Sequence, residues 1–189
     1  MTLYEEKILH ALYSCGAITK NTIRKLGGDE DTIINLIEKK LVKKEKMDID
    51  NKSIAVYRLT RQGEKMYIDR FGKKHFYRCS NLRKAAELGY FYASLTDEEK
   101  DSWKSKDELS QEMHCSMYPD SIFNKNGIPC GVFVIKAEDV DEKLASFKQF
   151  AKEQKIKVIL KKIYIIGRRK HERYWSCKKN RPIGEIGNS

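Results

Sequence analysis

Residues 36 to 63, LIEKKLVKKEKMDIDNKSIAVYRLTRQG, decide how the first part of this chain folds. The stretch opens with apolar residues at helical spacing and passes through Leu41-Val42 into a run of lysines. The polar segment from Asp48 to Ser53 separates that run from the apolar segment Ile54 to Leu59, which together predict a hairpin. Thr60 is a capping residue, so a further helix is expected to begin directly after the hairpin.

Three helices are expected before this hairpin. Thr2 to Cys15 carries apolar residues at helical spacing and is followed by a glycine. Thr19 is a good N-cap for a short second helix that stops at Gly27-Gly28. A third helix is expected from Asp29 to about Lys40, with one apolar face. The order expected over residues 3 to 72 is therefore three helices, a two-stranded hairpin and a fourth helix.

This order resembles the winged helix-turn-helix of bacterial regulators, in which the hairpin is the wing. Two segments carry the resemblance. Leu36 to Val42 matches the end of the recognition helix entering the wing, and Tyr57 to Gly63 matches the return strand and the cap of the next helix. The resemblance implies that the third helix enters the major groove of double-stranded DNA while the second helix and the wing hold phosphates.

On that basis Thr32 and Asn35 are the candidate base-reading residues, with Lys39 at the far end of the same helix. The candidate phosphate contacts on the second helix and the wing are Lys20, Asn21, Arg24, Lys43, Lys44, Lys46 and Lys52. A lysine-rich hairpin is also common as a merely solvated surface. The acidic run 29 to 31 suits the helix dipole but would repel phosphates. Winged helices also bind proteins or dimerise, so an adaptor role stays open.

The formal net charge of +11 favours polyanionic partners. The excess is concentrated near the C-terminus, where residues 155 to 181 hold 11 lysines and arginines against one glutamate. Residues 169 to 189 are expected to form a basic tail in which Tyr174 or Trp175 stacks on a base, or in which Trp175 simply packs on the domain. The candidate DNA contacts of this region are Arg168, Arg169, Lys170 and Arg173.

Residues 73 to 168 are expected to form a second, α/β domain after a boundary at Gly72, which makes the whole chain α+β. Asn126-Gly127 between two apolar runs predicts another hairpin. The expected elements are a helix from Ser80 to about Leu95, strands near 117–123 and 131–136, a helix over 137–154, and strands at 156–160 and 163–166.

The order of these elements resembles the restriction-endonuclease-like fold, in which two acids and a lysine bind Mg²⁺ and activate water. Asp120 matches the first acid and Lys136 the lysine, but the position of the second acid holds Val134. We therefore expect a degenerate domain with a vestigial site, unless Glu138 or Glu87 replaces the missing carboxylate. A metal-dependent DNA nuclease using Asp120 and Lys136 is the alternative, and a plain turn at Asp120 is the simplest explanation.

A winged helix followed by a degenerate nuclease-like half also resembles the replication-relaxation proteins of plasmids and other mobile elements. Leu41-Val42, Tyr57 to Thr60 and Tyr118 to Asp120 carry this resemblance. It implies a DNA-binding regulator or accessory factor in transcription, replication or transfer. A homodimer would suit palindromic DNA sites. We expect no enzymatic activity, no cofactor and no metal.

The sequence also bears on location. No signal peptide is recognisable at the start, and the longest apolar run, Ile163 to Ile166, is far too short to span a bilayer. The five cysteines are scattered and never spaced as C-x-x-C, which indicates reduced thiols. These features predict a cytoplasmic protein without a membrane partner.

Overall fold

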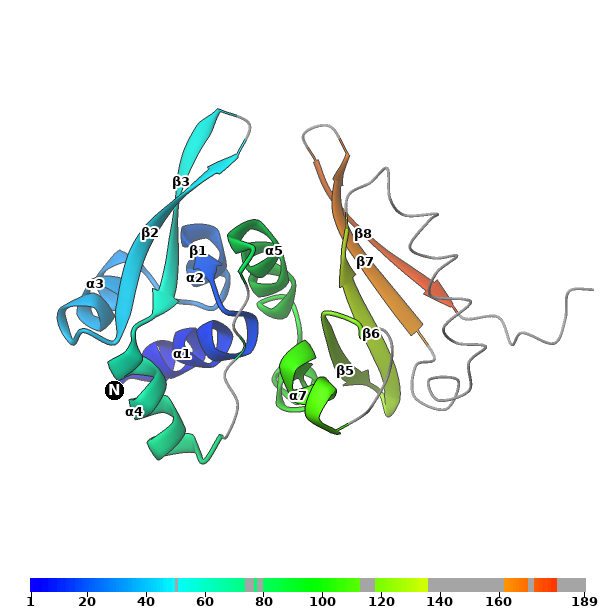
Figure 1. Cartoon of the computed structure of the whole chain (residues 1–189), viewed down its shortest axis with the longest axis horizontal. Helices are drawn as coiled ribbons and strands as arrows, with labels where there is room; N and C mark the ends of the chain where they lie inside the picture. The colour runs from blue at the N-terminus through cyan, green and yellow to red at the C-terminus, as the bar shows by residue number, and fades with distance from the viewer. Residues whose placement is uncertain are drawn as a thin grey trace, which may run out of the picture. The chain divides into compact units, whose positions relative to one another are not determined.

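The computed structural model describes residues 1–49, 51–73, 77, 80–112, 118–135, 162–169 and 172–179. Helices and strands are mixed along the chain, as the α+β prediction requires (Figure 1). The chain divides into two compact units, Met1–Asp97 and Glu98–Ser189. No helix in the described ranges is long and apolar enough to cross a membrane.

The first unit contains the elements expected between residues 3 and 72, together with one short strand and one more helix. They are α1 (Leu3–Cys15), β1 (Ile18–Thr19), α2 (Lys20–Lys25), α3 (Glu30–Glu38), β2 (Val42–Ile49), β3 (Lys52–Leu59), α4 (Arg61–Phe71) and α5 (Leu82–Tyr92). β1 was not expected; it pairs antiparallel with β3.

Local capping explains where these helices begin. The side chains of Thr2, Thr19, Asp29 and Thr60 each accept a hydrogen bond from a backbone N–H three residues ahead, at the starts of α1, α2, α3 and α4. α1 ends where Gly16 adopts the left-handed conformation, with φ at 83°. The predicted helix starts are therefore confirmed.

The hairpin of β2 and β3 is longer than predicted. Backbone pairing runs from Val42 opposite Leu59 to Ile49 opposite Lys52, beyond the predicted strand ends on both sides. The polar composition of Asp48 to Ser53 predicts a turn over these residues, but most of them lie in the two strands. The strands extend further because Met47 and Ile49 are buried in one cluster with Val56 of β3 and Ala86 of α5. Burial of that face outweighs the polar residues between them.

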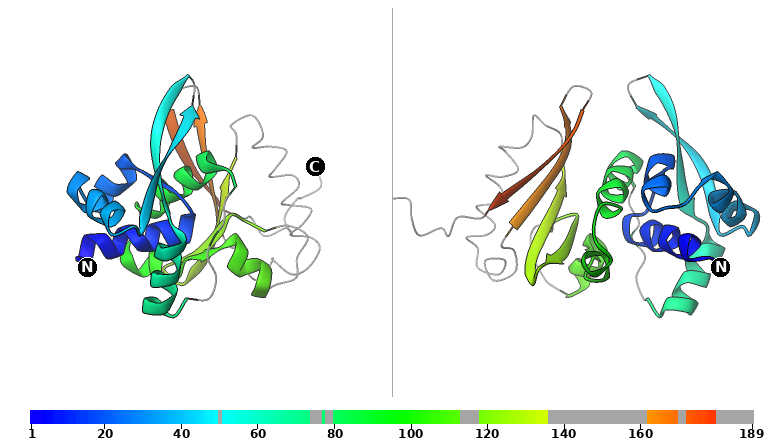
Figure 2. Two further views of the ribbon diagram at one scale, coloured as in Figure 1. Left: turned by 60° about the vertical axis from the view of Figure 1, so that its left-hand side comes forward. Right: turned by 180° about the vertical axis from the view of Figure 1, so that it is seen from behind.

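α5 belongs to the first unit, whereas the sequence analysis placed it in a second domain beginning after Gly72. It packs on α1, α2 and β1 (Figure 2). Gly89 makes the contact close: a Cβ atom there would lie 2.9 Å from both the Ala17 carbonyl oxygen and Ile18 Cγ2. Because the apolar face of α5 is buried on this unit, the compact unit ends at Asp97 and not at Gly72.

The second unit is built on a mixed sheet of order β4-β5-β6-β7-β8. Neighbouring strands are antiparallel except β6 and β7, which are parallel. Among the described residues, its elements are α6 (Asp97–Asp101), which begins at the boundary, β4 (Lys104–Ser105), α7 (Lys106–Glu112), β5 (Ser121–Lys125), β6 (Ile128–Val134), β7 (Lys162–Arg169) and β8 (Glu172–Lys179).

The hairpin predicted across Asn126-Gly127 is confirmed. Lys125 pairs with Ile128, and the two loop residues both have positive φ, 52° and 72°, as the favoured two-residue hairpin turn requires. The strand before the loop begins at Ser121, later than expected. The helix predicted over 137–154 and the strand predicted over 156–160 lie outside the described residues.

The C-terminal region differs from the expected basic tail. Residues 172 to 179 form β8, which pairs antiparallel with β7 along its whole length. The basic and aromatic composition of this segment does not reveal the strand, because strand formation depends on the partner strand. The expected strand 163–166 likewise extends to Lys162–Arg169.

Candidate nucleic-acid interface

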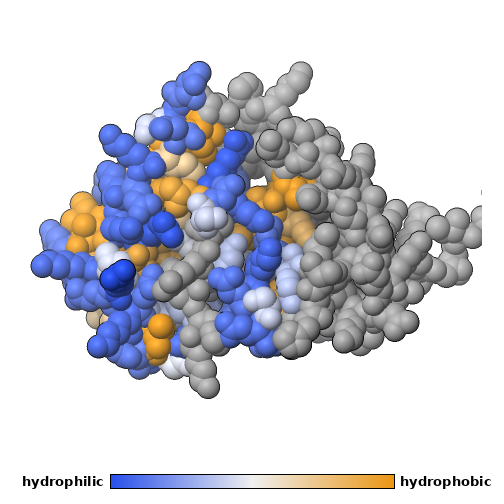
Figure 3. Space-filling view, in the orientation of Figure 1, coloured by the Kyte–Doolittle hydropathy of each residue, from blue (hydrophilic) through white to orange (hydrophobic). Residues whose placement is uncertain are grey.

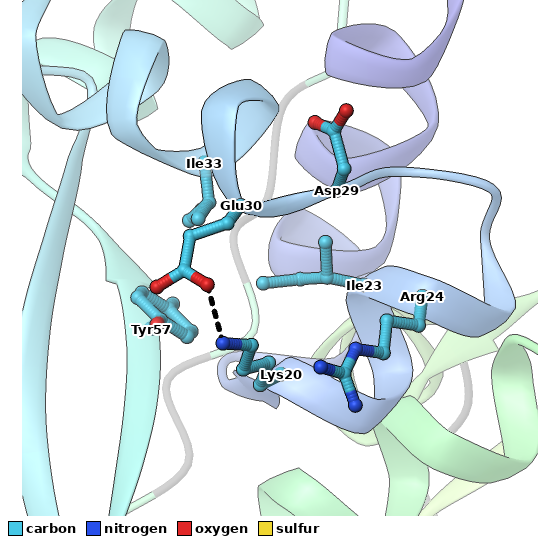
Figure 4. Close-up of a pocket in the computed structure, with 7 residues that line it drawn as sticks. All are labelled: Lys20, Ile23, Arg24, Asp29, Glu30, Ile33 and Tyr57. Carbon is cyan, nitrogen blue, oxygen red and sulfur yellow. Dashed lines mark hydrogen bonds and ion pairs between the residues drawn. The ribbon is translucent and has the colours of Figure 1, made fainter.

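The N-terminal ends of α2 and α3 meet at a small pocket beside β3 (Figure 4). Lys20 and Arg24 approach it from α2, Glu30 from α3, and the buried ring of Tyr57 from β3. The Lys20 ammonium nitrogen lies 2.5 Å from a carboxylate oxygen of Glu30. The remaining lining residues are Ile23, Asp29 and Ile33.

The sequence places these residues there through caps and a tight turn. Lys20 and Glu30 are the first residues of α2 and α3, each directly after an N-cap. The two helices are joined by Gly27, whose φ is 86°, and Gly28, where a Cβ atom would lie 2.9 Å from Ile8 Cδ1. Because only glycine fits this connection easily, the chain reverses within a few residues and the two helix starts come together.

Three cations act on Glu30. The pKa of its carboxyl is lowered, mainly by the hydrogen bond from Lys20 and then by the charges of Lys20, Arg24 and Lys44. Arg24 and Lys44 are exposed, and Lys44 lies on β2 directly opposite Tyr57. Part of the acidic run that was expected to repel phosphates is therefore balanced by basic residues from α2 and β2.

Thr32, a candidate base reader, uses its hydroxyl within the protein. The hydroxyl donates to Asp29 Oδ1 at 2.5 Å, and the Thr32 N–H donates to the same oxygen at 2.8 Å. These two hydrogen bonds, the side-chain one first, lower the pKa of Asp29. Asn35, the other candidate, is exposed one turn further along α3. Of the two, Asn35 has the more accessible side chain for a base edge.

Lys39 also has an internal role that sequence analysis missed. Its ammonium donates to Glu5 Oε1 at 2.6 Å, across from the C-cap of α3 to α1. Glu5 is only 2% exposed and also accepts the Thr2 N–H at 2.8 Å. Burial acts to raise the pKa of Glu5, but the hydrogen bonds from Lys39 and Thr2 lower it overall. The Lys39 head group therefore ties α3 to α1.

The wing lysines divide into two groups. Lys43 is paired with Glu45 at 2.6 Å on one face of β2. Lys44 and Lys46 lie on the opposite face of that strand because side chains alternate, and both are exposed. Lys52 is exposed at the start of β3. Within the described part of the chain, these last three lysines form no ion pair.

The other basic candidates lie on α2 and on the last two strands. Asn21 and Arg24 are exposed on α2. Arg168 and Arg169 end β7, and the backbone of Arg168 pairs with that of Arg173 on β8. The hairpin thus brings together basic positions that the sequence analysis had assigned partly to a tail. Lys170 lies outside the described residues.

Two positions of the expected nuclease motif, Asp120 and Val134, lie next to each other, but the second of them holds no acid. Asp120 is buried, and its Oδ2 accepts the backbone N–H of Val134 at 2.8 Å, so the first and second acid positions are adjacent. Lys136 and Glu138 lie outside the described residues, and Glu87 is on α5 in the first unit. In the described ranges, no group of three or more His, Cys, Asp or Glu residues is arranged to hold a metal.

Comparison with known proteins identifies no relative of this chain. No protein-family model, no curated protein and no solved structure gives a significant match to the chain.

Proposed function

We propose that the chain is a double-stranded-DNA-binding protein whose first unit acts as a winged helix-turn-helix. One observation carries the proposal: at the start of α3, Lys20 lies 2.5 Å from Glu30 and Arg24 lines the same pocket. Lys44 of β2 is exposed directly opposite Tyr57, which also lines that pocket. A helix flanked on both sides by cations is the arrangement that the phosphate backbone of duplex DNA favours.

In this proposal α3 enters the major groove and the elements around it hold the backbone. Asn35, exposed on α3, is the residue best placed to hydrogen-bond a base edge, and an Asn side chain suits adenine. Arg24 of α2 and Lys44 and Lys46 of β2 contact phosphates. Thr32 and Lys39 serve mainly to hold α3 in place, since their polar atoms are engaged within the unit.

The second unit contributes affinity through its basic strands β7 and β8 in the same proposal. The role as a regulator or accessory factor of a plasmid or other mobile element is supported only by the resemblance described from the sequence. A restriction-endonuclease-like origin for the second unit is supported by the adjacency of Asp120 and Val134. With valine at the second acid position, non-enzymatic DNA binding, as a homodimer on palindromic sites, is the function that we propose.

Fluorescence anisotropy of the full chain on random duplex DNA over a salt series tests this function. We expect the logarithm of the binding constant to fall linearly with the logarithm of the salt concentration. Exchanging Lys44 and Lys46 together for glutamate weakens binding and reduces the salt slope by about two, because each phosphate contact contributes about one.

Lys65→Glu is the control matched in charge to Lys44→Glu alone, since Lys65 is exposed on α4, outside the proposed contact. It is expected to change the affinity much less than Lys44→Glu does. Binding that does not depend on salt, or an equal loss from Lys65→Glu, would overturn the proposal.

Protein docking through α3 is the second candidate function. Ile34 is 43% exposed on α3, and the exposed residues Asp31 and Glu38 lie on the same helix. Exposed apolar side chains with acidic neighbours suit a protein partner better than they suit DNA. Figure 3 shows that the coloured part of the surface in view is mainly hydrophilic, with several apolar patches. The same salt series separates the candidates, because docking predicts no salt-dependent DNA binding.

A further inference from the structure

The carboxylate of Glu30 occupies the place where the basic residues around α3 meet. Figure 4 shows it directed from α3 toward Lys20 of α2, with Arg24 beside the same pocket. The Lys20–Glu30 distance is 2.5 Å, and the charges of Arg24 and Lys44 also favour the ionised form of this carboxyl. In the free protein, a carboxylate of the chain itself therefore lies among cations of α2 and β2.

This carboxylate is not needed to build the helix. Asp29 already caps α3 through its own side chain. The neighbouring Asp31 is also exposed at the same helix end but forms no ion pair in the described part of the chain. Of the acidic residues at the start of α3, Glu30 is the one that is paired with a proposed phosphate contact.

The Lys20–Glu30 ion pair is accessible to solvent and weak enough for another anion to replace Glu30. The side chain of Glu30 is 65% exposed and that of Lys20 is 44% exposed. Ion pairs on the surface contribute little to stability because water screens them and ordering two long side chains costs entropy. Ammonium and guanidinium groups bind phosphate oxygens in the same way as carboxylate oxygens. An external phosphate can therefore take the place of this carboxylate without disturbing the fold.

We propose that the pocket lined by Lys20, Arg24 and Tyr57 is a phosphodiester subsite that Glu30 closes in the free protein, and that a backbone phosphate of DNA opens it by displacing Glu30 from Lys20. The inference rests on the proposed DNA-binding function and adds a regulating residue to it. Glu30 lowers the affinity for single phosphates, so that only a duplex with many contacts binds firmly.

Glu30→Gln in the full chain tests the subsite, with Asp31→Asn as the matched control. Both changes remove one negative charge from the same exposed helix end. If Glu30 blocks Lys20, Glu30→Gln tightens binding to duplex DNA about three- to fivefold, the order expected for releasing a surface pair, and Asp31→Asn has a smaller effect. Lys20→Gln then removes most of the gain, because the two residues act through each other.

Inorganic phosphate provides a second readout that does not depend on DNA. We expect the NMR signals of Lys20 to respond to phosphate at several-fold lower concentration in Glu30→Gln than in the wild type or in Asp31→Asn. Equal responses in the three proteins, or a gain in DNA affinity that persists without Lys20, would overturn the subsite while leaving DNA binding intact. If no variant binds DNA but Lys20 still responds in this order, the subsite stands and the proposed function fails.

Discussion

Several charged side chains in this protein form ion pairs within the fold, so their charge is not free to bind a partner. Glu5 is the clearest case, because its buried carboxylate joins the start of α1 to the end of α3 by accepting from Thr2 and Lys39. The same contact explains why Lys39, which the sequence suggested as a DNA contact, is engaged within the protein. At the residue scale, the position of a lysine on a helix does not establish what the lysine binds.

Glu5→Gln should destabilise the protein by about 1–2 kcal/mol at neutral pH, because a hydrogen bond to a buried charged group is replaced by a weaker neutral one. Denaturant unfolding of both proteins measures this difference. Glu6→Gln is the control, since Glu6 pairs with Arg70 in a more exposed position. Similar losses in the two variants would contradict a special role for Glu5.

The same substitution has a defined pH dependence. The pKa of Glu5 in the folded protein is lowered, so its stabilising effect is present above the unfolded pKa, about 4.5, and is lost as pH falls through the folded value. The difference in unfolding free energy between wild type and Glu5→Gln is therefore expected to shrink on acidification below that range. If the difference in unfolding free energy between the two proteins grows in acid, the pKa of Glu5 is not lowered by folding.

At the scale of elements, close packing of α5 on β1 and α1 completes the first unit. Gly89 permits the approach because any Cβ atom would lie 2.9 Å from the backbone oxygen of Ala17. α4 packs on α1 from another part of the chain, where the ring of Tyr67 stacks on that of Tyr13 with centroids 4.2 Å apart. Helices that follow the hairpin thus return to cover the first helix.

Gly89→Ala tests the packing of α5, because helix propensity and close packing predict opposite changes in stability. In an isolated helix this change is stabilising by about 1 kcal/mol. In this protein we expect a loss of about 1–3 kcal/mol, because α5 must move away from β1 to accommodate the methyl group. Thermal unfolding followed by circular dichroism measures the change, and a rise in melting temperature would show that α5 does not pack tightly there.

At the scale of the whole molecule, the boundary between the compact units lies beyond α5. Met47, Ile49 and Val56 of the hairpin share their cluster with Ala86, which a fragment ending at Gly72 would lack. We expect a fragment of residues 1–97 to unfold cooperatively on heating, and a fragment of residues 1–72 to unfold at lower temperature or without a cooperative transition. Equal melting of the two fragments would place the boundary back at Gly72.

Local signals in the sequence predicted most of the first unit and one hairpin of the second. Caps such as Thr19, Asp29 and Thr60 act on an N–H three residues away, and Asn126-Gly127 sets its turn within two residues, so neighbouring residues contain the necessary information. The compact unit extends beyond the predicted boundary at Gly72, because a glycine at a helix end marks a local stop and does not indicate where the next helix packs.

The sequence by itself therefore determined the order of the helices and of the hairpin through residue 72, although not the short strand β1, together with the turn chemistry and the concentration of positive charge. Only the tertiary structure decided that Lys20 meets Glu30, ten positions away, that Lys39 meets Glu5, 34 positions away, and that the segment from Glu172 to Lys179 is a strand. The physical reason is that capping and alternation act between near neighbours, whereas ion pairs, strand pairing and helix packing depend on which distant segments the core brings together.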